Sequence, residues 1–167
     1  MRPKTLLSAP LNFLEIVIGY VGAGATKALF IGVVILGTAA FFVDLQIMHP
    51  VAMVIFLLLT CMSFSLLGFI IGIWARNFEQ LQLVPLLVVT PLIFLGGAFY
   101  SISMLPPFWQ TVTLFNPVVY LISAFRWSFY GVSDVNVGIS VAMTAVFMLI
   151  CLFIIRWIFQ SGYRLRS

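Results

Sequence analysis

The stretch that decides the fold is Leu105–Trp127, LPPFWQTVTLFNPVVYLISAFRW, which lies between two long apolar runs. Proline lacks a backbone N–H and clashes with the preceding helical turn, so Pro106 and Pro107 stop any helix that enters the stretch. Pro117 follows about ten residues later. A helix needs roughly 20 residues to cross a bilayer. The stretch therefore predicts two short helices, neither of which crosses.

The composition predicts that the solvent of this chain is lipid. Of its 167 residues, 63% are hydrophobic and only 7% are charged. A soluble domain with so few charges does not cover its own surface, so we expect an all-α, polytopic membrane protein. The net charge of +4 is too sparse and scattered for a nucleic-acid surface. Cys61 and Cys151 lie in apolar runs, where we expect packing residues and neither a disulfide nor a metal or cofactor site.

Four apolar segments have the length of a membrane helix. They are Ala28–Val43, Val51–Ala75, about Leu81–Tyr100, and Val135–Ile155. Thr26 and Lys27 extend the first segment at its front, where the lysine is expected to reach the membrane surface along its own stem. Pro85 and Pro91 are expected to bend the third segment.

The charged residues predict the orientation. With four spans, one face of the membrane receives most of the basic residues, namely Arg2, Lys4, Arg76, Arg156, Arg164 and Arg166. Asp44, His49 and Asp134 fall on the other face, with Arg126 as the basic exception. Because lysine and arginine favour cytoplasmic loops, we expect four spans and two cytoplasmic termini. The two short helices then enter the membrane from outside and return.

A segment that enters the membrane and turns back leaves backbone groups unpaired at membrane depth. Lipid does not pair them, so protein must cover them or they must line a water-filled path. The re-entrant pair therefore predicts the outer mouth of a transport path. An interfacial amphipathic hairpin is the simpler alternative.

The tract Gly96–Trp127, GGAFYSISMLPPFWQTVTLFNPVVYLISAFRW, combines several features in a fixed order. It has paired glycines at the end of a span, a Leu-Pro-Pro turn, an Asn-Pro, and an arginine after an apolar helix. This order resembles the signature of the ABC-2 family of transporter permeases. The residues that carry it are Gly96, Gly97, Pro106, Pro107, Asn116, Pro117 and Arg126. A second tract, Thr5–Phe30, is similar to that family's cytoplasmic coupling region and the start of its third span.

The resemblance covers nearly the whole chain and implies one ABC-2 permease domain over residues 1–167. It implies the membrane-spanning subunit of an exporter in the inner membrane of a bacterium. Two permease copies, expected to be a homodimer, would pair with two copies of a separate ABC ATPase subunit. Members of the family have six spans, so the resemblance also implies a chain that lacks the first two. A non-transporting membrane scaffold or assembly factor is the alternative function.

The sequence contains no GxxxxGK[ST] phosphate loop, so ATP hydrolysis is expected in the partner and not in this chain. Energy must then arrive by contact. The segment Lys4–Glu15 best resembles the family's coupling element, with Ser8 and Pro10 in a turn and Glu15 at the docking end. An ordinary juxtamembrane anchor is the alternative. An intramembrane hydrolase is disfavoured because no acid lies inside any predicted span.

Two further features have a structural and a functional interpretation. Gly68 and Gly72 form a GxxxG pattern, which allows close helix packing, here expected within one subunit more than between two. Arg126 precedes Asp134 by eight residues on the outer side. An unpaired arginine at the membrane edge is costly, so Arg126 either reaches water or pairs with an acid. It would then anchor the re-entrant helix or take part in gating.

Overall fold

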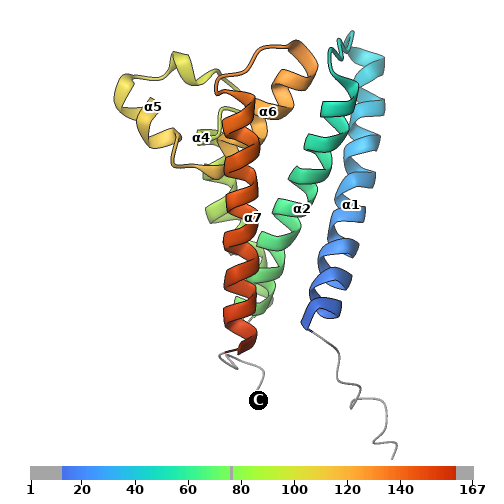
Figure 1. Ribbon diagram of the computed structural model, residues 1–167, viewed down its shortest axis with the longest axis vertical. Coiled ribbons are helices and arrows are strands. Elements are labelled where there is room, and N and C mark those ends of the chain that lie inside the picture. The colour runs from blue at the N-terminus through green and yellow to red at the C-terminus, as the bar shows by residue number, and fades with distance from the viewer. Residues whose placement is uncertain (1–12, 76, 161–167) are drawn as a thin grey trace, which may run out of the picture.

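The protein is seen here in a computed structural model that describes residues 13–75 and 77–160. All regular secondary structure in these residues is helical (Figure 1). In chain order the elements are α1 (Phe13–Phe42), α2 (Pro50–Trp74), α3 (Phe78–Val84), the π-helical turn η1 (Pro85–Val89), α4 (Thr90–Leu95), the 3-10 turn η2 (Ile102–Met104), α5 (Pro107–Thr113), α6 (Pro117–Tyr130) and α7 (Val137–Gln160). This confirms the predicted all-α fold.

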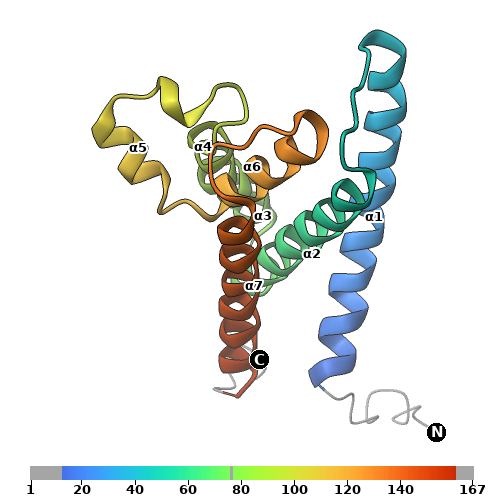
Figure 2. The same cartoon turned by 45° about the horizontal axis from the view of Figure 1, so that its top comes forward.

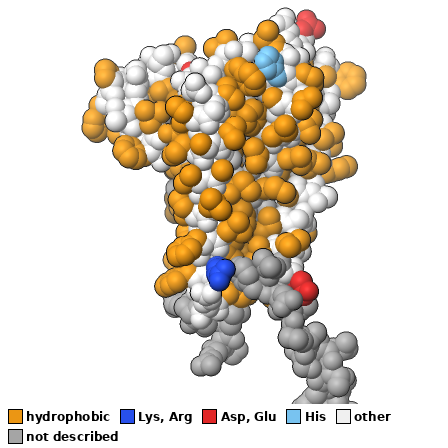
Figure 3. Space-filling view, viewed as in Figure 1, with side chains coloured by type: hydrophobic (Ala, Val, Ile, Leu, Met, Phe, Trp, Pro, Cys, Tyr) orange, Lys and Arg blue, Asp and Glu red, His pale blue; other side chains and the backbone are white. Residues whose placement is uncertain are grey.

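Four of these helical stretches are long and apolar enough to cross a membrane. They are Glu15–Phe42, Pro50–Trp74, Phe78–Leu95 and Val137–Gln160. Helix α1 begins and α7 ends at the same end of the bundle, opposite the α1–α2 connection (Figure 1). On the face seen in Figure 3, acidic side chains lie near the two ends and hydrophobic side chains fill the band between them. Such a band suits a bilayer, where apolar side chains have no reason to be buried.

The helix of the first span begins at Phe13 and the candidate span at Glu15, so the predicted start at Ala28 was wrong. Gly19, Gly22 and Gly24 lower the helix propensity of this segment in water. In a bilayer each backbone N–H must be paired within the segment, and that requirement outweighs propensity. Lys27 consequently lies in the middle of α1 and not at its front.

The second and fourth spans follow the prediction closely. Helix α2 differs from the expected Val51–Ala75 by one residue at each end, and Pro50 occupies its first turn, where a missing N–H does no harm. Helix α7 ends at Gln160, beyond the predicted Ile155. The helix continues past Arg156 because a charged side chain at a membrane end extends along the helix toward water.

The third span is one helical stretch with an irregular turn at its proline. The backbone N–H of Thr90 donates to the carbonyl of Pro85, five residues back, which makes a π-helical turn. Proline has no N–H to donate and its ring crowds the preceding turn, so a wider turn fits here. The span ends at Leu95 and not at Tyr100. The cause is Gly97, whose φ of +77° favours glycine.

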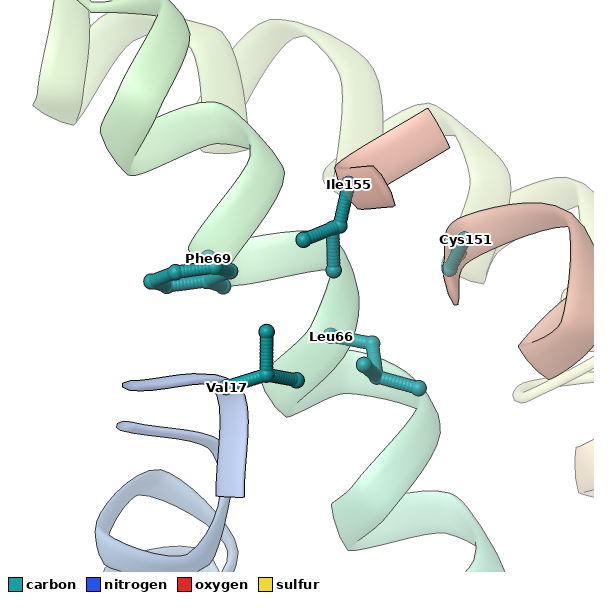
Figure 4. Close-up of a cluster of buried hydrophobic side chains, with 5 residues drawn as sticks. All are labelled: Val17, Leu66, Phe69, Cys151 and Ile155. Atoms are coloured by element: carbon teal, nitrogen blue, oxygen red, sulfur yellow. The ribbon is translucent and has the colours of Figure 1, made fainter. Parts of the chain in front are cut away.

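A small hydrophobic core joins three of the long helices (Figure 4). Val17 of α1 packs with Leu66 and Phe69 of α2 and with Cys151 and Ile155 of α7. Ile155 is fully buried. Both cysteines of the chain are buried as free thiols, which agrees with the prediction that they are packing residues.

The contact between α1 and α2 uses two of the five glycines in α1, Gly24 and Gly32, and neither glycine of the GxxxG. The Ser65 hydroxyl of α2 donates to the Val21 carbonyl of α1 at 2.9 Å, and Ser65 occupies the space a side chain at Gly24 would need. A Cβ added at Gly68 or Gly72 would meet no atom of the described chain within 4 Å. In the described part of the chain no neighbouring helix lies against these two glycines, so their role in helix packing stays a prediction.

Candidate functional site

The segment between α4 and α7 contains two short helices at a sharp angle. Pro107 and Pro117 each lie in the first turn of their helix, and α5 and α6 have 7 and 14 residues. At 1.5 Å per residue they are about 10 Å and 21 Å long, shorter than the ~30 Å hydrocarbon core. Their axes differ by 94°. In Figure 2, α5 projects to the side of the bundle while α6 lies against it. The predicted pair of short helices is confirmed.

A network centred on Arg126 joins the two ends of this segment. Its Nη1 lies 2.6 Å from Oδ2 of Asp134, and its Nη2 donates to the carbonyls of Gly97 and Tyr100, the latter at 3.3 Å. The Ser101 hydroxyl donates to the other carboxylate oxygen of Asp134. Of the two alternatives for Arg126, pairing with an acid is the one observed.

The positions of the Arg126 partners in the chain show the path of the segment between α4 and α7. Gly97 and Tyr100 follow α4, whereas Asp134 precedes α7. Because both ends of the segment meet at one guanidinium, the chain leaves this end of the bundle and returns to it. That path is the geometry of a re-entrant pair. The Arg126 and Asp134 side chains are 24% and 13% exposed, so much of the ion pair is covered by protein.

Asn116 attaches the start of α6 to the end of the third span. Its Nδ2 donates to the carbonyl of Leu92 at 2.6 Å, a carbonyl in the last turn of α4. Carbonyls in the last turn of a helix lack helical partners, so the side-chain amide supplies one. The Oδ1 of Asn116 accepts from the backbone N–H of Val118 at 3.0 Å and caps α6. The Asn-Pro dipeptide therefore begins a helix and fastens it.

The two glycines of the signature have different roles. A Cβ at Gly96 would stand 3.0 Å from Cδ1 of Ile122 on α6, closer than side chains ordinarily pack. Gly97 reverses the chain through its positive φ and presents its carbonyl to Arg126. The glycine pair therefore allows α6 to approach the end of the third span.

Further contacts of the pair were not expected from the sequence. The Tyr120 hydroxyl donates to the Leu114 carbonyl at 2.7 Å, and Nε2 of Gln110 donates to the Leu105 carbonyl at 2.8 Å. Both acceptors are backbone atoms in the turns on either side of α5. Sequence patterns indicate donors of this kind but do not identify their acceptors, because every residue has a carbonyl.

The α1–α2 connection is also joined to α6. The backbone N–H groups of Met48 and His49 donate to the carbonyls of Phe129 and Ser128 at 3.2 and 3.0 Å. The His49 and Trp127 rings meet edge to face with their centroids 4.1 Å apart. The last turn of α6 is therefore held by the α1–α2 connection as well as by the contacts of Arg126.

A pocket of about 520 Å³ lies between α6, α4 and the halves of α1 and α2 that face them. Its wall is mostly apolar, with Leu57, Phe64, Ile122 and Phe125 among the lining residues. Arg126 is the charged residue in that lining. A large apolar pocket with a few polar groups is the usual form of a small-molecule site. No simple sequence signal predicts it, since its walls come from four separate elements.

Of the predicted coupling residues the structure describes Glu15, at the end of α1 that is far from the re-entrant pair. Lys4, Ser8 and Pro10 are outside the described residues, so their role stays a prediction. Glu15 is an exposed residue in the first turn of α1, where a carboxylate interacts favourably with the helix dipole. Across residues 13–75 and 77–160, no group of three or more His, Cys, Asp or Glu side chains is placed to hold a metal ion.

Comparison with known proteins identifies the family. The family described as ABC-2 type transporter matches residues 4–130. The chain belongs to this family. The matched residues of this ABC-2 protein include the first three spans and the whole re-entrant pair, and the match ends with α6.

Two groups of relatives of this ABC-2 chain are known by name. It is 42% identical to the inner membrane transport permease YadH of Escherichia coli strain K12, over 98% of this chain and 64% of that protein. It is 25% identical to nodulation protein J of Rhizobium meliloti strain 1021, over 90% of this chain and 58% of that protein. The chain thus spans less than two-thirds of the length of these relatives. No solved structure matches it.

Proposed function

We propose that this chain is a membrane-spanning subunit of an ABC exporter in the inner membrane, driven by a separate ATPase subunit. Family membership supports the general class. The single observation that carries the proposal is the Arg126 network, which returns the α5–α6 segment to the end of the bundle where it began. A non-crossing segment fixed in this way is useful where a path through the membrane must open.

The outer part of the path is the pocket beside α6. The volume of about 520 Å³ suits an apolar or amphiphilic substrate, and the Arg126 side chain offers one polar contact in its wall. Because α6 is attached to α4 through Asn116 and to the α1–α2 connection through His49, a movement of any of these elements would change the shape of the pocket.

The opposite end of the bundle is the cytoplasmic one in this proposal. Positive residues favour the cytoplasm, and Arg156 lies near the end of α7 that is far from the re-entrant pair. Both termini are then cytoplasmic. Glu15, together with Lys4, Ser8 and Pro10, would meet the ATPase there. Two copies of this chain, related as a homodimer, would pair with two ATPase copies.

Co-expression with an ABC ATPase encoded beside this chain tests the proposal. We expect the two proteins to co-purify, and ATP hydrolysis in proteoliposomes to rise several-fold when this chain is present. An ATPase whose phosphate-loop lysine is replaced serves as the control and should bind without hydrolysing ATP. If the ATPase does not co-purify and this chain instead forms a stable complex with an unrelated membrane protein, the scaffold function is correct and the exporter subunit is not.

A further inference from the structure

Lys27 lies near the midpoint of α1, the helix that contains the first candidate span. At 1.5 Å per residue about 20 Å of helix separates it from either end, and a bilayer centred on this helix would put Lys27 at mid-depth. The contact with α2 gives the same depth independently. Ser65 meets α1 at Val21 and Gly24, and Lys27 lies about one turn farther along, opposite the middle of α2. The expectation that Lys27 extends to the membrane surface was based on a span that began at Ala28.

The stem of a lysine does not reach water from this depth. The surface of the hydrocarbon core is about 15 Å from its middle, far beyond four methylene groups. A charged side chain at the bilayer centre is costly unless it pairs with an opposite charge or faces water. Lys27 is exposed on the surface of the described chain, where it has neither a hydrogen bond nor an ion pair.

No carboxylate of this sequence lies at the depth of Lys27. The chain has four acidic residues, and all are in the described part. Glu15 and Glu79 are in the first turns of α1 and α3, whereas Asp44 follows α1 and Asp134 precedes α7. All four therefore lie near helix ends. A second copy of the chain in the same orientation brings the same four positions, so it supplies no mid-depth partner either.

A pocket of about 440 Å³ has Lys27 in its lining. Its wall includes Tyr20, Lys27, Ser65, Gly68 and Phe69. The Tyr20 and Phe69 rings meet with their centroids 5.1 Å apart and give the pocket an aromatic side. The Ser65 hydroxyl already donates to Val21, and a Cβ at Gly68 would meet nothing within 4 Å. The pocket thus offers one cation beside an apolar surface kept open by glycine.

We propose that Lys27 binds the anionic group of the transported amphiphile while its apolar part lies against Tyr20 and Phe69. The ligand class is an amphiphile with a phosphate or carboxylate and an alkyl chain or a comparable apolar body. That the ligand is transported rests on the proposed function, whereas the anion site rests only on the position and surroundings of Lys27. Binding brings a negative charge to Lys27 without burying an unpaired ion.

A binding experiment without any ATPase tests the site. The chain is placed in phosphatidylcholine nanodiscs, and binding of labelled lysophosphatidic acid is compared with binding of the monoacylglycerol that has the same acyl chain. We expect the anionic probe to bind at least about tenfold more tightly, because hydrogen bonds to charged groups exceed neutral ones. The preference should fall to about onefold in Lys27→Gln and persist in Lys27→Arg. Arg156→Gln, which removes a cation at the end of α7, is the matched control and should keep it.

Lys27→Gln removes an unpaired charge from the bilayer and should leave the fold intact, which size-exclusion chromatography and the thermal midpoint will verify. A thiol-labelling experiment adds a second measurement. With a membrane-impermeant maleimide, Lys27→Cys should react faster than Leu149→Cys, an exposed position near the middle of α7. The wild-type chain, with two buried cysteines, gives the baseline.

Three results would overturn the anion site. They are equal binding of the two probes by the wild type, an unchanged preference in Lys27→Gln, and an effect of Lys27→Gln on self-association with none on the preference. The last result would make the Lys27 face a subunit contact. If the preference depends on Lys27 but no ATPase couples to the chain, the proposed function fails and the anion site stands.

Discussion

The guanidinium of Arg126 and the carboxylate of Asp134 lie 2.6 Å apart and hold together three parts of the chain that are distant in sequence. Through its other nitrogen, Arg126 reaches the residues that follow the third span, and Asp134 leads into the fourth. One ion pair therefore determines where the non-crossing segment begins and ends. The stability of this junction is open to direct measurement.

Arg126→Ala should lower the free energy of unfolding by about 1–3 kcal/mol, because it leaves a partly covered carboxylate without its partner. Asp134→Asn should have a similar effect, and the double variant should cost less than the sum of the two, by more than about 0.5 kcal/mol. Denaturation in detergent measures all three. Arg156→Ala, at an exposed position, is the control. Additive losses would mean that the two side chains do not interact in solution.

Gly97→Ala should destabilise the protein by about 1–2 kcal/mol, since alanine is strained at the φ of +77° found there. Gly68→Ala provides the matched control. A methyl group at Gly68 meets nothing, and alanine favours helix over glycine by about 1 kcal/mol. Thermal unfolding of the two variants should therefore shift in opposite directions. A stable Gly97→Ala protein would show that the turn after α4 adopts another conformation.

Replacing Pro106 and Pro107 by alanine should impair export while insertion into the membrane stays normal. The two prolines stop α5 from extending backward through Leu105 and the preceding 3-10 turn. Without them the entry to the re-entrant pair changes shape, and the pocket beside α6 changes with it. Transport into inverted vesicles is the measurement, with protein amount in the membrane as the control. Transport at the wild-type rate would show that the turn at Pro106 and Pro107 does not shape the transport path.

Cysteine labelling tests the orientation. Ser103→Cys lies on the exposed loop after the third span and should react with an impermeant reagent applied outside intact cells. Ser161→Cys, in the terminal segment outside the described residues, should react only after the inner face is opened. Labelling of both from the same side would disprove the single crossing, through α7, that the proposal places between them. If Ser161→Cys reacts from outside and Ser103→Cys only from inside, the protein has the opposite orientation in the membrane.

Glu15→Lys should weaken the stimulation of the ATPase by this chain. The residue is exposed in the first turn of α1, at the end of the bundle where the proposal locates the ATPase contact. Reversing its charge replaces any attraction to a basic groove by repulsion. ATP hydrolysis by the reconstituted complex measures the effect, and Glu79→Lys, in the first turn of α3, is the matched control. Equal stimulation in the two variants would remove Glu15 from the coupling contact.

The sequence predicts this fold best where residues that stop or begin helices lie next to apolar runs. Proline occupies the first turn of α2, α5 and α6, and the start of α2 agrees with the predicted Val51 within one residue. The start of α1 was wrong because the segment before Lys27 contains glycines and a carboxylate. Such a composition resembles a surface segment, although the bilayer favours a helix there.

The site was predictable as a set of residues but not as a set of contacts. Arg126, Asn116 and the glycine pair were all singled out from the sequence, and the structure brings each of them to the end of the third span. Their partners are largely backbone carbonyls, which carry no sequence signal. The depth of Lys27 depended on where α1 begins, so a wrong boundary concealed it.

The wide turn from Pro85 to Val89 divides the third span into two parts with different attachments. The part beyond it is fastened to the re-entrant pair through Leu92 and Gly97, whereas the part before it, α3, contacts α2. A turn whose hydrogen bonds span five residues resists twisting less than the regular helix on either side. Rotation between the two parts would concentrate at this turn, and the part of the span that carries the re-entrant pair would then tilt independently of α3.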